Sequence, residues 1–234
     1  MQEFNKYELL TLERNFISFY GLVKNNCPTL FKDGKYWYKK ENKHIKKVAK
    51  RYGMTVRQYA EITARLSIRN NWIRNRLDAV RLSYNKILGR PIDAVKVCTT
   101  KVHKNIAYEY CDGIGTIQPN ALKIHAFAKN LQLNKDYVTI DVWIKRAFTN
   151  CWDVDSFDMN SKQYEQLSNI IKKVAKEENL IPYQVQAIAW NGARNNIFNK
   201  DTIYIKGMYS EPKHKTRKPR ELAKVQKNIF SVTS

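Results

Sequence analysis

One stretch of the chain, residues 113–148, combines residue types that can do chemistry beside a phosphate backbone. Its sequence, GIGTIQPNALKIHAFAKNLQLNKDYVTIDVWIKRAF, predicts a turn, a short helix with Lys123 near its start, a connection, and a helix opened by Asp141. Backbone N–H groups at a helix start can bind a phosphate. A carboxylate at the next helix start lies in a dipole field that stabilises negative charge. There it can stabilise a cationic transition state or activate a nucleophile.

Both residues also have a structural interpretation, which the sequence leaves open. Asp141 can be a helix N-cap that contributes about 1 kcal/mol to stability. Lys123 can be one lysine of a lysine-rich chain that contacts a phosphate or the solvent.

The elements that must position these residues are predicted to be helices. A hydrophobic fraction of 43% with only 8 Gly and 6 Pro is typical of a helical protein with a real core. Residues 92–111 are compatible with a strand or a helix, and Pro28 and the Asp33-Gly34 pair predict turns. Helical periodicity predicts helices over 1–25, 43–52, 55–66, 70–88, 122–131 and 141–149, from Ser161 onward, and over 182–194.

The charge of the chain points to a polyanionic partner. Lys and Arg outnumber Asp and Glu by 42 to 21, for a formal net charge of +21, which suits phosphate backbones or an anionic membrane surface. No apolar run approaches the roughly 18 residues of a spanning helix, and the first fifteen residues lack a signal-peptide core. We therefore expect an intracellular protein with no membrane partner.

Cysteine usage predicts neither a metal nor a disulfide framework. The four cysteines, Cys27, Cys98, Cys111 and Cys151, are scattered and form no CxxC pair. Without a secretion signal we expect reduced thiols. The sequence thus predicts no metal site and no cofactor.

The lysine, the acid and their spacing resemble the helix-hairpin-helix DNA glycosylases, of which endonuclease III is a member. Lys123 lies eighteen residues before Asp141, which is the spacing of the lysine and the aspartate in endonuclease III-like enzymes. Arg146 follows the acid by five residues, where that family often has arginine. The segment ARLSIRNNWIRNRLDA at 64–79 is similar to the family's early helix, and Arg69 holds the place of a base-pocket residue.

The resemblance covers about residues 45–195. The chain is also similar to small phage-encoded proteins with a TID-W/H segment and a late QAI-W---R segment, whose function is not settled. In this chain Gln186, Trp190 and Arg194 recur at four-residue intervals, so one helix face would carry them. We weigh two interpretations of this face, contact with the bound strand or packing between helices. Trp72 is expected in the core more than in a base-stacking role.

The resemblance implies an all-α fold of two helical lobes with a cleft, and a monomer that binds double-stranded, possibly modified, DNA. It implies that a nucleotide is flipped out, because its base–sugar bond is inaccessible inside the stack. Asp141 would stabilise the oxocarbenium-like sugar, and Lys123 would attack the anomeric carbon if the protein also has lyase activity. Nucleic-acid contacts are expected from Arg69, Asn70, Asn71, Gly113, Gly115, Asn120, Arg146, Arg194, Lys215 and Arg217.

Departures from the family pattern keep two further functions open. The hairpin segment PNALK at 119–123 lacks both family glycines, and Val142-Trp143 replaces the usual Thr-His after the acid. The cluster-binding cysteines of endonuclease III are absent, so no iron–sulfur cluster is implied. The alternatives are a catalytically inactive DNA-binding protein on the same fold, and a phage enzyme that modifies thymidine bases in DNA.

Three segments are predicted along the chain. Residues 1–42 would form an N-terminal helix and a connecting segment, 43–210 a glycosylase-like helical domain, and 211–234 a basic tail. The basic clusters at 43–51 and 213–220 predict a phosphate-binding surface.

Overall fold

The computed structural model describes residues 3–68, 70–149, 159–195 and 197. All of its regular structure over these residues is helical, which confirms the all-α class for the described part of the chain. The described residues all belong to one compact unit. Two glycosylase-like lobes with a cleft stay a prediction, and the basic tail at 211–234 lies outside the described residues. None of the described helices has the length and apolar character that crossing a bilayer requires.

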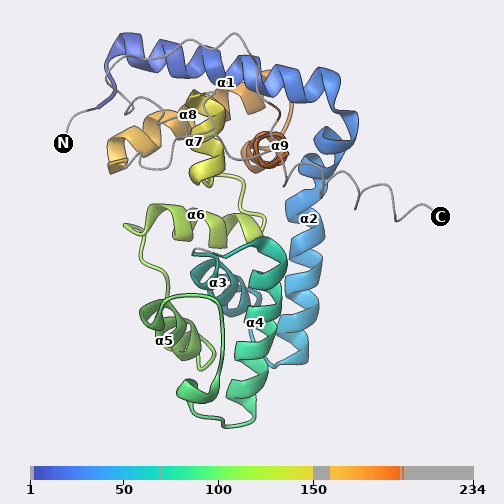
Figure 1. Cartoon of the computed structure of the whole chain (residues 1–234), viewed down its shortest axis with the longest axis vertical. Helices are drawn as coiled ribbons and strands as arrows, with labels where there is room; N and C mark the ends of the chain where they lie inside the picture. The colour runs from blue at the N-terminus through green and yellow to red at the C-terminus, as the bar shows by residue number, and fades with distance from the viewer. Residues whose placement is uncertain (1–2, 69, 150–158, 196, 198–234) are drawn as a thin grey trace, which may run out of the picture. The chain divides into compact units, whose positions relative to one another are not determined.

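Figure 1 shows the order of the helices along the chain. Their bounds are α1 (Lys6–Asn26), α2 (Pro28–Arg51), α3 (Val56–Leu66), α4 (Trp72–Ile87), the short 3₁₀ helix η1 (Ile92–Ala94), α5 (Lys101–Tyr110), α6 (Leu122–Leu131), α7 (Val142–Thr149), α8 (Ser161–Glu177) and α9 (Pro182–Arg194).

Side-chain caps and turn residues set many of these bounds. The Thr55 hydroxyl accepts from the Gln58 N–H at the start of α3, and the Gln58 side-chain oxygen accepts from the Thr55 N–H. Pro182 occupies the first turn of α9, where its missing N–H costs nothing. The ambiguous residues 92–111 contain η1 and α5 and no strand. Local capping chemistry therefore explains where these helices begin.

The prediction of turns at Pro28 and Asp33-Gly34 is wrong. Pro28 is the first residue of α2, and the helix continues through Gly34 without a break, so the predicted division at residues 42 and 43 falls inside it. Gly34 is where α2 meets α9, since an added Cβ would lie 2.5 Å from Ile188 Cα. The glycine thus permits close packing of two helices, which a local turn rule cannot foresee.

α2 packs against both of the sets into which the other helices fall (Figure 1). One set is α1, α7, α8 and α9, where the buried rings of Phe16 and Phe148 stack with centroids 4.5 Å apart. The other set surrounds α3, which contacts α4, α5 and α6 and buries Tyr59, Ile62 and Leu66. A pocket opens where α2 joins the two sets.

Candidate functional site

The pocket has a volume of about 280 Å³ and is lined from α2, α4, α6, α7 and α9 and the segments before α4 and α7. Its size is close to the lower end of the roughly 300–1,000 Å³ of small-molecule sites. Five of the residues predicted to act in catalysis or to contact nucleic acid line it together: Asn70, Asn71, Lys123, Asp141 and Arg194. Residues that are up to 124 positions apart in the chain therefore share one cavity.

Aromatic rings form much of the pocket wall. Trp37 of α2 is central, with its ring centroid 4.9 Å from that of Trp72 and 5.5 Å from that of Trp190. The ring of Phe127 on α6 stacks toward Trp37 at 6.3 Å. Trp72 both packs against the core and lines the pocket, so it is not confined to the core as the sequence suggests. Flat apolar walls of this kind suit a planar ring.

Hydrogen bonds hold the Asp141 carboxylate from two helices. Its Oδ1 accepts from the N–H groups of Trp143 and Ile144, both at 3.0 Å, so Asp141 caps α7 as the sequence predicts. Its Oδ2 accepts from the Trp190 Nε1–H of α9 at 3.0 Å. Oδ2, which accepts a single bond, can accept one more, and the half-buried side chain lines the pocket. The carboxylate is both a structural cap and a charge presented to the pocket.

The extended segment before Asp141 is fixed by Tyr164 of α8. The Tyr164 hydroxyl donates to Val138 O at 2.8 Å and accepts from Ile140 N–H at 3.0 Å. Burial raises the pKa of this hydroxyl above its ordinary value, which keeps it protonated and able to donate. Three helices, α7, α8 and α9, thus determine where the acid lies.

A second buried hydroxyl joins α2 to α9 at the pocket. Tyr38 is 2% exposed, and its hydroxyl donates to Gln186 Oε1 at 2.8 Å. Burial raises the pKa of Tyr38, and the nearby charge of Asp141 raises it further. Gln186 belongs to the predicted face of α9, and the structure confirms that Gln186, Trp190 and Arg194 meet at one site.

Two asparagine side chains at the start of α4 are held by hydrogen bonds that their amide nitrogens donate. Asn70 Nδ2 donates to Asp78 Oδ2 at 3.2 Å, and Asn75 Nδ2 donates to Thr63 O at 3.0 Å. Both Oδ1 atoms are buried without a hydrogen-bond partner in the described structure. A buried acceptor without a partner is costly, so this wall carries unused hydrogen-bonding capacity. Neighbouring Asn71, in contrast, caps α4 by accepting from Arg74 N–H at 2.9 Å.

Lys123 lines the pocket from the start of α6. It is the second residue of α6 and is exposed. Ala121 at the N-cap has no side-chain acceptor, so the first N–H groups of α6 have no side-chain cap. A lysine beside an uncapped helix start is a suitable place for a phosphate group.

The two predicted arginines on α7 and α9 differ in position. Arg194 is exposed and lines the pocket, with its guanidinium carbon 4.6 Å from the ring centroid of Trp190. Arg146 is buried, with its guanidinium carbon 4.5 Å from the ring centroid of Trp143. The pocket lining includes Arg194 and does not include Arg146.

Three further predicted contact residues, Gly113, Gly115 and Asn120, are described by the structure and are not part of the pocket lining. Gly113 and Gly115 have φ angles of +76° and +74° in the turn after α5, a conformation that favours glycine. The Gly113 N–H bonds Tyr110 O at 3.1 Å, so it serves the end of α5. Asn120 is exposed just before α6. The other three, Arg69, Lys215 and Arg217, lie outside the described residues.

The sequence did not single out several pocket residues. Trp37 and Tyr38 belong to the segment that was predicted as a connection, and Phe127 reads as an ordinary apolar residue of a helix face. Asn75 carries no motif of its own, whereas Thr139 is the first residue of the TID segment and was a second candidate for the cap of the helix over 141–149. For the two α2 aromatics, the pairing of Pro28 with a long helical periodicity was the available signal. Cys27, Cys98 and Cys111 are free thiols away from this lining, while Cys151 is outside the described residues.

Fold and site together define an all-helical protein with an aromatic-walled pocket that presents a lysine, an arginine and a capped carboxylate. The chain belongs to a family of unknown function (DUF7178), whose model matches residues 5–197. No curated protein matches the chain, and no solved structure does.

Proposed function

We propose that the chain is a DNA-binding protein of glycosylase type, which takes a flipped nucleotide into the pocket and cleaves its base–sugar bond. The observation that carries this proposal is the convergence of Lys123, Asp141 and Arg194 on one pocket with aromatic walls. The family resemblance selected the lysine and the acid, and both line a cavity whose flat apolar walls suit a planar base. The net charge of +21 suits a phosphate backbone outside it.

Each part of the pocket has a task in this reaction. The rings of Trp37 and Phe127 stack on the base, which compensates for the stacking lost from the duplex. The base leaves with the bonding electron pair and takes up a proton. Water then adds to the anomeric carbon and loses a proton, which balances the proton that the base gained. The negative charge of Asp141 stabilises the oxocarbenium-like sugar between these events. Lys123 and the start of α6 bind the adjacent phosphate, and the Lys123 amine is the candidate nucleophile of a lyase step.

One observation favours a second function, DNA binding without cleavage. Both oxygens of Asp141 already accept hydrogen bonds, from α7 and from Trp190, as in a purely structural cap. The Val142-Trp143 pair and the missing hairpin glycines agree with a frame that has lost the reaction. In that case the pocket holds the flipped base and releases it unchanged.

The test is the release of free bases from DNA, followed by mass spectrometry, on unmodified and phage-type modified duplexes. Glycosylase activity is supported if a base is released and Asp141→Asn abolishes the release, because the asparagine keeps an Oδ1 cap but has no charge. Circular dichroism of the variant verifies that α7 is intact. Release from none of the DNAs, with salt-sensitive binding retained, would reject cleavage and leave the binding protein.

A further inference from the structure

The outer face of α2 carries a row of lysines. Five of them, which we call the lysine row, are Lys32, Lys39, Lys43, Lys46 and Lys50, and all five are exposed. Their spacing of seven, four, three and four residues keeps them on one face of a helix with 3.6 residues per turn. At a rise of 1.5 Å per residue the row extends over about 27 Å.

The charge of this row is not balanced by acids within the described structure. α2 contains two acids, and both serve elsewhere. Asp33 pairs with Lys40 at 3.1 Å, and Glu41 is buried on the opposite face, 3.6 Å from Arg76. No described acid forms an ion pair with a lysine of the row. Five like charges held along one rigid helix repel one another, and a polyanion relieves that repulsion.

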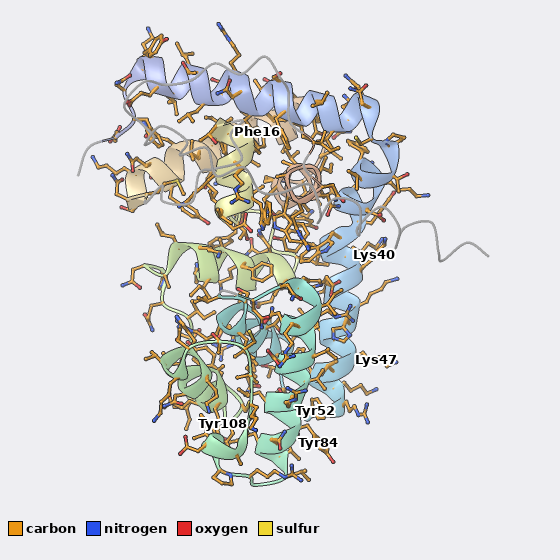
Figure 2. The ribbon with its side chains drawn as sticks, in the orientation of Figure 1. Phe16, Lys40, Lys47, Tyr52, Tyr84 and Tyr108 are labelled. Carbon is orange, nitrogen blue, oxygen red and sulfur yellow. The ribbon has the colours of Figure 1, made fainter. Side chains whose placement is uncertain are left out.

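The lysine row and the pocket lie on opposite sides of α2. Trp37 and Tyr38 face the pocket, and steps of 100° per residue place their mean direction about 180° from the row. In Figure 2, Lys40 and Lys47, which flank the row, extend from α2 away from the other helices. A DNA segment at the pocket therefore leaves the lysine row uncovered.

We infer that the lysine row is a second nucleic-acid-binding surface, which holds the phosphate backbone of a DNA duplex separate from the one at the pocket. A length of about 27 Å spans roughly eight base pairs of a straight duplex. Lysines are point charges without the bidentate geometry that reads bases, so the contact is independent of sequence. The protein then bridges two duplexes, and it does so whether or not the pocket cleaves a glycosidic bond.

The chemistry of α2 favours DNA over a lipid surface. A helix that lies on a membrane inserts an apolar face into the headgroup region. The apolar face of α2, with Tyr38, Ile45 and Val48, is buried against other helices of the protein. The row offers charge and nothing to insert.

The test compares two variants with the same change in net charge. In the row variant all five row lysines become Gln. In the control variant five exposed lysines on other elements become Gln: Lys6, Lys96, Lys101, Lys172 and Lys176. Both keep the C-terminal tail. Binding of a fluorescent duplex is measured at several salt concentrations, and energy transfer between two differently labelled duplexes reports bridging.

The wild-type chain is expected to bridge duplexes, and the row variant to lose the energy transfer. The slope of log K against log salt should fall by about three to four for the row variant, at about 0.9 per phosphate contact, and by at most about one for the control. A third variant with Arg at the five row positions should bridge like the wild type. Protection of the row lysines from acetylation by bound duplex, measured in the wild type, makes the test independent of any effect on folding.

Three results would overturn the inference. The first is a wild-type chain that binds one duplex and does not bridge. The second is an equal effect of the row and control variants, which would reduce the row to general charge. The third is a row variant that keeps its duplex affinity and loses binding to vesicles of phosphatidylcholine and phosphatidylserine.

Discussion

Asp141 and Lys123 line the same pocket but are held by the fold in different ways. Asp141 accepts three hydrogen bonds, two from α7 and one from α9, and Tyr164 fixes the segment before it. Lys123, in contrast, extends from the uncapped start of α6 and is exposed. The acid is positioned before any ligand binds, whereas the lysine and the N–H groups at the helix start are free to bind a ligand. A preorganised charge opposite an adaptable one is a suitable arrangement for a ligand with a fixed ring and a variable backbone.

The largest expected effect concerns the contact of α2 with α9, the helix whose Trp190 bonds Asp141. Gly34→Ala places a Cβ 2.5 Å from Ile188 Cα and 2.7 Å from Ile188 N, where backbone must move. We expect the free energy of unfolding to fall by about 3 kcal/mol, as for other overpacked contacts. Chemical denaturation measures it.

Gly21→Ala is the matched control for this substitution. Gly21 also lies inside a helix, α1, but an added Cβ would meet nothing within 4 Å. There the alanine should raise stability by about 0.5–1 kcal/mol through helix propensity. Equal effects at the two glycines would contradict the importance of the α2–α9 contact.

A smaller effect on stability distinguishes Asp141 from Lys123 directly. Asp141→Ala removes the cap of α7 and the bond to Trp190, and should cost about 2 kcal/mol of folding free energy. Lys123→Ala should change stability by less than about 0.5 kcal/mol, as for an ordinary surface site. Thermal unfolding of both variants tests this. A similar loss of stability in the two variants would contradict the view that Asp141 is fixed by the fold and Lys123 is not.

The smallest effect is a pH dependence of folding stability that comes from Tyr38. The raised pKa of buried Tyr38 means that its neutral form stabilises the fold. This contribution is complete below the unfolded-state pKa of about 10 and is lost as the pH rises above it. Tyr38→Phe should therefore remove about 1 kcal/mol of the stability loss between pH ~9 and ~11. Urea titrations at both pH values measure it, with the exposed Tyr7→Phe as a control that should leave the loss unchanged.

The sequence predicted most of the helices because their signals are local. The capping residues Thr55 and Asp141 and the helix-initiating Pro182 act within one turn of their positions. Gly34 defeated the prediction because its reason is tertiary, a backbone 154 positions away. The Asp-Gly pair has the composition of a turn, and packing against α9 overrides it.

The site was predictable where spacing along one helix or a family pattern applied. Regular intervals identified Gln186, Trp190 and Arg194, and the resemblance identified Lys123 and Asp141, all of which line the pocket. The aromatic wall was not predictable, because a ring that faces a cavity and a ring that faces the core have the same helical periodicity. Which of them faces the cavity depends on the packing of α2 between two sets of helices.

The indole of Trp190 has a consequence for the charges beside it. Its edge donates to the Asp141 carboxylate while its face carries the Arg194 guanidinium at 4.6 Å. One indole ring thus interacts with both charges: its π face contacts the cation, and its N–H donates to the anion. The ring prevents the arginine and the aspartate from collapsing into a mutual ion pair, in which each would neutralise the other. Both charges therefore stay available to whatever enters, as two separate poles across a single indole.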